Sequence, residues 1–139
     1  MLKRVASIVF LLVGVVIGLG TFGHGSAASR VHAAIDQFPI DHHIHATLYI
    51  VWYFVTGCML AFGDIIVWIW LRVRSGDTAL LSAAIPMGIL YLTTGIGASL
   101  YEPGQRFWML FVTLGGLLLI SAYVLRRSVL RVNPPQYCH

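Results

Sequence analysis

Charged residues are scarce in this chain. Lys, Arg, Asp and Glu together make up 10% of the 139 residues, whereas about a quarter is usual for a soluble domain. Apolar residues make up 58%, and the mean hydropathy is +0.84. Most of the surface must therefore face something other than water. The length allows one domain and no more.

Several chemical motifs are also missing. The two cysteines, Cys58 and Cys138, fall in an apolar run and in the C-terminal tail, so they are not expected to form an intramolecular disulfide. Gly-x-Ser-x-Gly, His-Glu-x-x-His and phosphate-binding loops do not occur. The basic residues flank apolar runs and leave no basic face for nucleic acid. These absences disfavour an enzyme and a nucleic-acid-binding protein.

Long apolar runs are what the sequence does contain. They cover residues 5–22, 44–71, 79–101 and 107–125, and about 20 residues are needed to cross ~30 Å of hydrocarbon. The run 44–71 exceeds this length, so its helix should tilt or extend into the headgroup zone. The prediction is an all-α integral membrane protein, a four-span helical bundle forming one transmembrane domain over residues 1–139. In the first run, Gly14-x-x-x-Gly18 offers a flat strip for close helix contact.

The first run has a second interpretation. Residues 1–28 could be a cleaved signal peptide, with Ser26-Ala27-Ala28 at the cleavage site. The run is longer than the ~7–15 apolar residues usual in a signal peptide, which favours a retained helix. Cleavage would leave three spans with the same orientation.

Loop charges predict the orientation. With the N-terminus in the cytoplasm, only Arg30 and Arg106 are external. The seven cytoplasmic basic residues are then Lys3, Arg4, Arg72, Arg74, Arg126, Arg127 and Arg131. This bias follows the positive-inside rule. It places both termini in the cytoplasm of a cell with an inner (plasma) membrane, with residues 126–139 as a cytoplasmic tail.

The first external loop, residues 23–40, is the first polar stretch. Ser29 could cap a short amphipathic helix that lies in the membrane interface, and Pro39 would end it. His32 and Asp36 are four residues apart on its polar face, so they can meet.

Polar residues of the run 44–71 fall on one side of a helical wheel. At about 100° per residue they occupy an arc of about 100° that begins with His42 and His45. The remaining members of this polar line are Tyr49, Tyr53, Thr56 and Asp64. Because lipid cannot satisfy polar groups, the line is expected to point into the bundle. An acid within a span is a functional candidate, although a polar latch between helices explains it equally well.

The external histidines suggest a metal site. His42 and His45 are three residues apart on one helical face, a spacing that lets two imidazoles converge on one ion. The candidate ligands are His42, His45, His32, Asp41 and Asp36. Imidazole with carboxylate suits Zn or Cu. A haem is less expected, because only His45 lies near the edge of a span. Histidines in the membrane interface also occur without binding any metal or cofactor.

Three functions remain open. The leading hypothesis is a small accessory or scaffold subunit of a membrane complex, embedded in the lipid bilayer beside a membrane-protein partner or as a homo-oligomer. The second is an external metal or redox-cofactor protein that uses the histidines. The third is proton-coupled small-molecule transport through Asp64.

Overall fold

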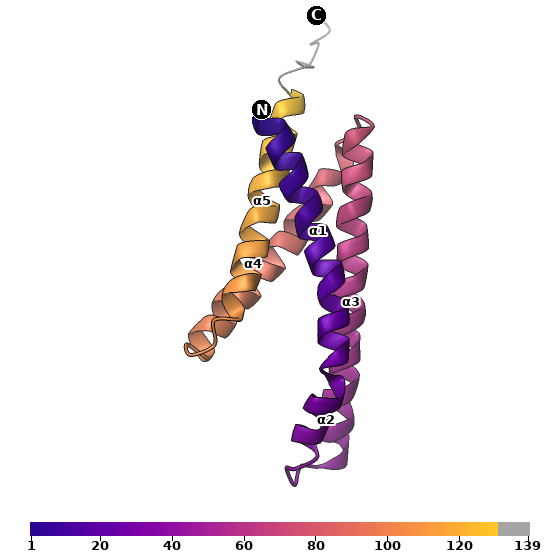
Figure 1. Cartoon of the computed structure of the whole chain (residues 1–139), viewed down its shortest axis with the longest axis vertical. Helices are drawn as coiled ribbons and strands as arrows, with labels where there is room; N and C mark the ends of the chain where they lie inside the picture. Colours follow the sequence, from indigo (N-terminus) through magenta and orange to yellow (C-terminus); the bar gives the residue numbers. More distant parts are fainter. Residues whose placement is uncertain (131–139) are drawn as a thin grey trace, which may run out of the picture. The chain divides into compact units, whose positions relative to one another are not determined.

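The computed structural model describes residues 1–130, and these residues contain helices and short connections without any strand (Figure 1). The helices are α1 (Leu2–Ser26), α2 (Ala28–Ile35), α3 (His42–Arg74), the 3₁₀ helix η1 (Ala79–Ala83), α4 (Ala84–Tyr101) and α5 (Trp108–Leu130). Four segments within the described residues are long and apolar enough to cross a membrane: Leu2–Ser26, His42–Arg74, Ala79–Tyr101 and Trp108–Ser128. The prediction of an all-helical, multi-pass membrane protein is confirmed at this level.

The helices extend beyond the apolar runs. α3 begins at His42, because Oδ1 of Asp41 accepts a hydrogen bond from the backbone N–H of His43 at 2.8 Å and caps the first turn. α5 continues past Leu125 to Leu130, so the start of the predicted tail is helical. The rest of that tail, with Cys138, lies outside the described residues, and Cys58 is a free thiol.

The short helix α2 differs in detail from its prediction. Ala27 precedes its first residue without a side-chain cap, and Ser29 lies inside the first turn. The predicted Ser29 cap is therefore wrong. The helix also ends at Ile35, before Pro39, so the proline does not end it.

The chain divides into two compact units. Unit 1 combines Met1–Val13 with the chain from Ile66 onward, and unit 2 is Gly14–Ile65. α1 and α3 each contribute to both units.

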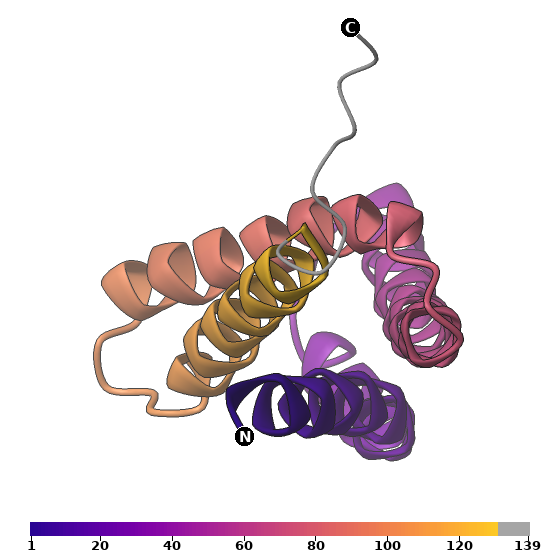
Figure 2. The ribbon, with the colours of Figure 1, turned by 90° about the horizontal axis from the view of Figure 1, so that it is seen from above.

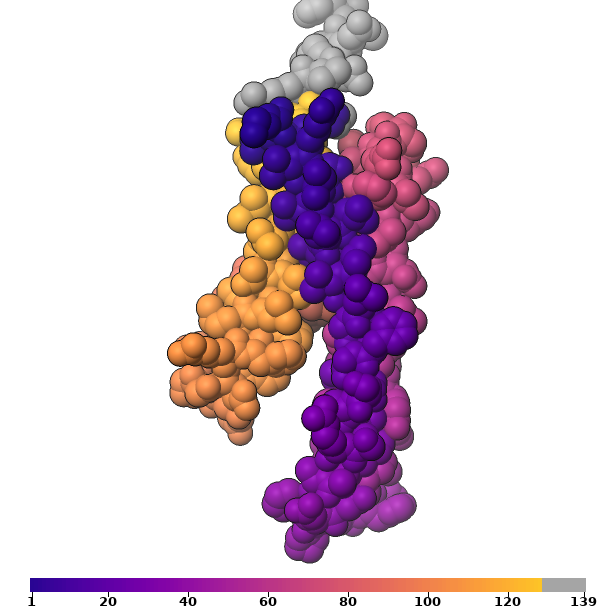
Figure 3. Space-filling view, in the orientation of Figure 1, coloured from indigo at the N-terminus to yellow at the C-terminus, as the bar shows by residue number. Residues whose placement is uncertain are grey.

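In unit 1, α4 and α5 lie side by side in both ribbon views (Figures 1 and 2), and the space-filling view (Figure 3) shows one face of α5. Glycines allow this approach. A Cβ at Gly115 would lie 2.5 Å from the backbone nitrogen of Leu92, and one at Gly95 would lie 2.6 Å from that of Val112. Small residues on facing helices are a usual means of close packing within membranes.

In unit 2, the second half of α1 packs against the first part of α3. A Cβ at Gly63 would lie 2.6 Å from Cα of Gly18 and 2.9 Å from the carbonyl oxygen of Gly14. The predicted contact strip Gly14-x-x-x-Gly18 is therefore a contact surface, and its counterpart on α3 is Gly63.

Candidate functional site

Asp36, the residue that follows α2, is the centre of a polar cluster in unit 2. Its Oδ1 accepts one hydrogen bond from Nε2 of His45 at 2.7 Å and another from the hydroxyl of Tyr49. Because a carboxylate only accepts, Nε2 of His45 carries a proton. His45 and Tyr49 are one turn apart on α3, so both side chains reach the same carboxylate.

These contacts favour the ionised form of Asp36. The hydrogen bond from Tyr49 is the largest influence and lowers the pKa of Asp36 below its ordinary value. Partial loss of hydration opposes this shift, and the hydrogen bond from His45 adds to it. The electrostatic interactions with His45 and His32 lower the pKa of Asp36 further.

His32 joins α2 to the same face of α3. Its ring stacks on Tyr49 with centroids 3.8 Å apart, and it meets the edge of Tyr53 at 5.5 Å. Nε2 of His32 is buried and has no hydrogen-bond partner within residues 1–130. His32 thus contacts α3 through its ring face.

His24 makes the corresponding contact from α1. Its ring stacks on Trp52 at 3.9 Å, and its Nδ1 lies 2.8 Å from Oγ1 of Thr56. The Thr56 hydroxyl donates its hydrogen to the carbonyl oxygen of Trp52 at 2.8 Å. Thr56 therefore accepts from His24, and Nδ1 of His24 carries the proton.

These contacts define the histidine–aromatic cluster. It consists of two groups packed on α3: one contains His32, Asp36, His45 and Tyr49, and the other contains His24, Trp52 and Thr56. It joins α1, α2 and α3 through stacked rings and charge-assisted hydrogen bonds, each worth more than a neutral one. Its chemistry is that of an acid, an imidazole and a phenol, which together can bind and release protons.

The five predicted metal ligands do not form one shell. His45 and Asp36 are hydrogen-bonded to each other, and His32 lies beside them across Tyr49. Asp41 instead caps α3, and His42 is exposed with its ring beside that of His43. Within the described part of the chain, no three His, Cys, Asp or Glu side chains are placed to hold a metal ion.

The predicted polar line on α3 divides into two groups. Tyr49 and Thr56 contact α2 and α1 through His32 and His24, as expected for a face that points inward. Tyr53 is 55% exposed, and Asp64 is exposed too. For these two residues, the orientation toward the bundle stays a prediction.

The sequence interpretation missed two members of the cluster, His24 and Trp52. Trp52 lies four residues before Thr56, so it shares the face of the polar line. Its ring is largely apolar, so Trp52 is not among the polar residues of that line. A histidine just beyond the first apolar run, as His24 is, was a signal for a contact with this face.

Acidification provides a test of the cluster. The pKa of Asp36 is lower in the folded state than its ordinary value of 3.8. Its stabilising effect is therefore complete above that value and is lost as the pH falls through the lowered pKa. We expect hydrogen exchange at the α2–α3 connection to accelerate below about pH 4, beyond the intrinsic pH effect on exchange.

Two variants make this measurement specific. Asp36→Asn should remove the acid-induced step, because the titrating group is gone. Asp77→Asn should keep the step, since Asp77 lies in unit 1 and bonds to Arg72 and the backbone of Ala79. An unchanged acid profile in Asp36→Asn would contradict the assignment.

Comparison with known proteins gives no relative: no protein-family model, no curated protein and no solved structure matches this chain.

Proposed function

We propose that this protein is a small accessory or scaffold subunit of a membrane complex in the inner (plasma) membrane. The observation that carries the proposal is Asp64. It lies within the candidate span His42–Arg74, its side chain is exposed, and it has no hydrogen bond or ion pair to any residue in the described range 1–130.

The depth of Asp64 makes its exposure costly. It precedes Arg72 by eight residues, which is roughly 12 Å along a helix. A carboxylate facing hydrocarbon costs about 2.5–3.5 kcal/mol on insertion scales. A hydrogen-bond donor or a cation from a neighbouring transmembrane helix would offset this cost, and we assign that helix to a partner subunit.

The surroundings of Asp64 suit a helix as the neighbour. Gly57, Leu60 and Ala61 precede Asp64 by one or two turns on the same side of α3, and all three are exposed. A Cβ at Gly57 would meet nothing within 4 Å. We call these four residues the Asp64 face. Small residues beside a polar one are typical of helix contacts in membranes.

The proposed orientation follows the basic residues. Nε1 of Trp70 donates to Oγ of Ser7 at 3.0 Å, which joins the start of α1 to the end of α3 within unit 1. The start of α1, the end of α3 and the end of α5 carry six basic residues among those described: Lys3, Arg4, Arg72, Arg74, Arg126 and Arg127. The positive-inside rule supports a cytoplasmic location for this end and for the N-terminus.

The other two hypotheses have less support. The metal site lacks a third ligand in the part of the chain that the structure describes. The transport hypothesis requires a continuous polar line from His45 to Asp64. His45 is bonded to Asp36, whereas Asp64 has no hydrogen bond or ion pair within residues 1–130.

Native mass spectrometry of gently solubilised membranes tests the proposal. Wild-type protein is expected at a mass above the monomer, as a complex with a second membrane protein or with further copies of itself. Asp64→Leu should lower the yield of that complex by about tenfold or more, since a hydrogen bond to a charged group contributes about 1.5–3 kcal/mol.

A carboxylate away from the Asp64 face serves as the control. Glu102 follows α4 and accepts a hydrogen bond from Nε1 of Trp108 at 3.3 Å. Glu102→Gln should leave the complex intact. A lone wild-type monomer in mild detergent would refute the proposal, as would equal complex yields for wild type and Asp64→Leu.

A further inference from the structure

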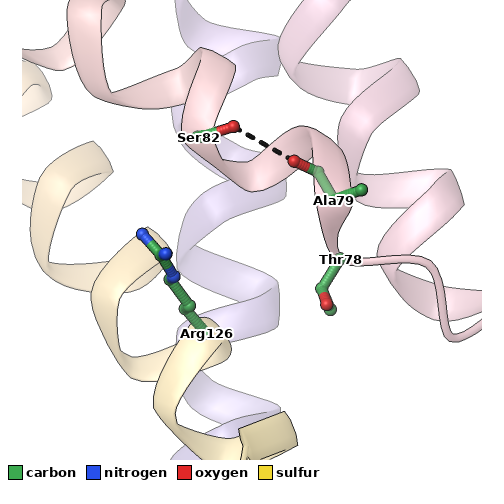
Figure 4. Close-up of a pocket in the computed structure, with 4 residues that line it drawn as sticks. All are labelled: Thr78, Ala79, Ser82 and Arg126. Atoms are coloured by element: carbon green, nitrogen blue, oxygen red, sulfur yellow. Dashed lines mark hydrogen bonds between the residues drawn. The ribbon is translucent and has the colours of Figure 1, made fainter.

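Two adjoining cavities lie in unit 1, and Arg126 of α5 lines both. The first is about 230 Å³ and is lined by Thr78, Ala79, Ser82 and Arg126 (Figure 4). The second is about 220 Å³, and its other lining residues are Leu81, Ile85, Leu119, Ala122 and Tyr123. The first cavity has mixed polar and apolar walls and is called the polar cavity, whereas the second is almost wholly apolar and is called the apolar cavity. Arg126 lines both.

Arg126 differs from three other arginines at this end of unit 1. Arg72 lies 3.5 Å from a carboxylate oxygen of Asp77. Arg74 lies over the ring of Trp70 at 4.9 Å, and Arg127 over that of Tyr123 at 5.3 Å. Arg126 has no hydrogen bond, ion pair or ring contact within residues 1–130. Its charge is available to an anion.

The polar cavity offers further donors and no competing acid. Figure 4 shows the Arg126 side chain extending from α5 toward the turn that carries Ser82. The Ser82 hydroxyl bonds to the carbonyl oxygen of Ala79 at 3.1 Å and can turn toward a stronger acceptor. The nearby Asp77 is already bound to Arg72 and to the N–H of Ala79.

The apolar cavity restricts the class of ligand. A soluble anion would fill only the polar cavity and leave the apolar cavity empty. Each cavity is smaller than the ~300–1,000 Å³ of sites that enclose a whole small molecule. An amphipathic ligand with an anionic head and a hydrocarbon chain fits both cavities at once. In a membrane, that ligand is a phospholipid.

We propose that Arg126, with the hydroxyls of Thr78 and Ser82, binds the phosphate of an anionic phospholipid, one of whose acyl chains enters the apolar cavity between η1, α4 and α5. Basic pockets between transmembrane helices are known to hold anionic headgroups, and a surrounding cluster of basic residues attracts such lipids. The inference uses the multi-pass character of the chain and is independent of the partner at the Asp64 face.

Lipid titration of the purified full chain, followed by native mass spectrometry, tests the site. The probe is phosphatidylglycerol, and phosphatidylcholine with the same acyl chains is the zwitterionic comparison. Wild-type protein should retain phosphatidylglycerol in preference to phosphatidylcholine. Arg126→Gln should weaken that retention about fivefold to tenfold, as expected for the loss of one basic contact, whereas Arg126→Lys should keep most of it.

Arg127→Gln is the matched control, since it removes the same charge one residue away, on a side chain that lies over Tyr123. Equal losses in Arg126→Gln and Arg127→Gln would overturn the site and leave only general attraction to basic residues. Equal retention of the two lipids would overturn it as well. Displacement of the lipid by millimolar inorganic phosphate would show a site for free phosphate and would refute the lipid.

Discussion

Gly115→Ala is expected to destabilise the α4–α5 pair strongly. The added Cβ would lie 2.5 Å from the backbone nitrogen of Leu92 and 2.7 Å from the carbonyl oxygen of Gly88. Backbone atoms of a helix cannot rotate away, so the two helices must separate. Overpacking of this kind costs about 1–3 kcal/mol or more, and the better helix propensity of alanine returns only about 1 kcal/mol. The net result is a lower free energy of unfolding.

The adjacent glycine provides the control. A Cβ at Gly116 would meet nothing within 4 Å. Gly116→Ala should therefore leave stability unchanged or raise it by up to about 1 kcal/mol. Thermal unfolding in detergent, followed by tryptophan fluorescence, measures both variants against wild type. Equal Tm values for the two variants would contradict the close approach of α4 and α5 at Gly115.

The four spans could be predicted from the sequence because hydropathy and length suffice for a helix in lipid. The helix ends could not, because hydrogen bonds of single side chains decide them. Ser29 and Asp41 are both good N-cap residues by type. Asp41 caps α3, whereas Ser29 lies inside α2. Ala27, the residue before α2, already has a helical backbone conformation (φ −79°, ψ −11°), whereas an N-cap residue is non-helical. Residue type does not reveal this.

The candidate site was predictable in part. The wheel correctly placed Tyr49 and Thr56 on one face, and both contact histidines from other helices. An arc of about 100° is wide enough, however, for a neighbouring helix to pack at either margin. α1 packs against the edge of this arc where Gly63 lies. Asp64 is about 100° further round the helix and is exposed. A hydropathy pattern does not show against which edge of the arc the neighbouring helix packs.

Sequence type also could not distinguish a metal ligand from a hydrogen-bond partner. His45 and Asp36 suit either role, and in the structure they bind each other at 2.7 Å. A metal site would need a third ligand that converges on the same ion as His45 and Asp36. It depends on where α2 lies against α3, which the spacing along the sequence does not specify.

Gly63→Ala is expected to disrupt unit 2. Its Cβ would lie 2.6 Å from Cα and N of Gly18, both backbone atoms. The contact is asymmetric, because a Cβ at Gly18 would lie 3.7 Å from Cα of Gly63, an ordinary van der Waals distance. Gly63→Ala should therefore lower the free energy of unfolding by about 1–3 kcal/mol, while Gly18→Ala should be tolerated. The same thermal unfolding measurement compares them, and equal losses for both would refute this geometry.

Gly57 separates folding from partner binding on the same helix. A Cβ at Gly57 meets nothing within 4 Å, so Gly57→Ala should keep the thermal stability of the isolated chain. Gly57 belongs to the Asp64 face, where a neighbouring transmembrane helix is proposed to approach closely. The same substitution should therefore reduce the yield of the complex in native mass spectrometry. A stable Gly57→Ala protein with full complex yield would mean that the partner helix does not approach α3 at this face, because a close helix contact has no room for the added methyl group.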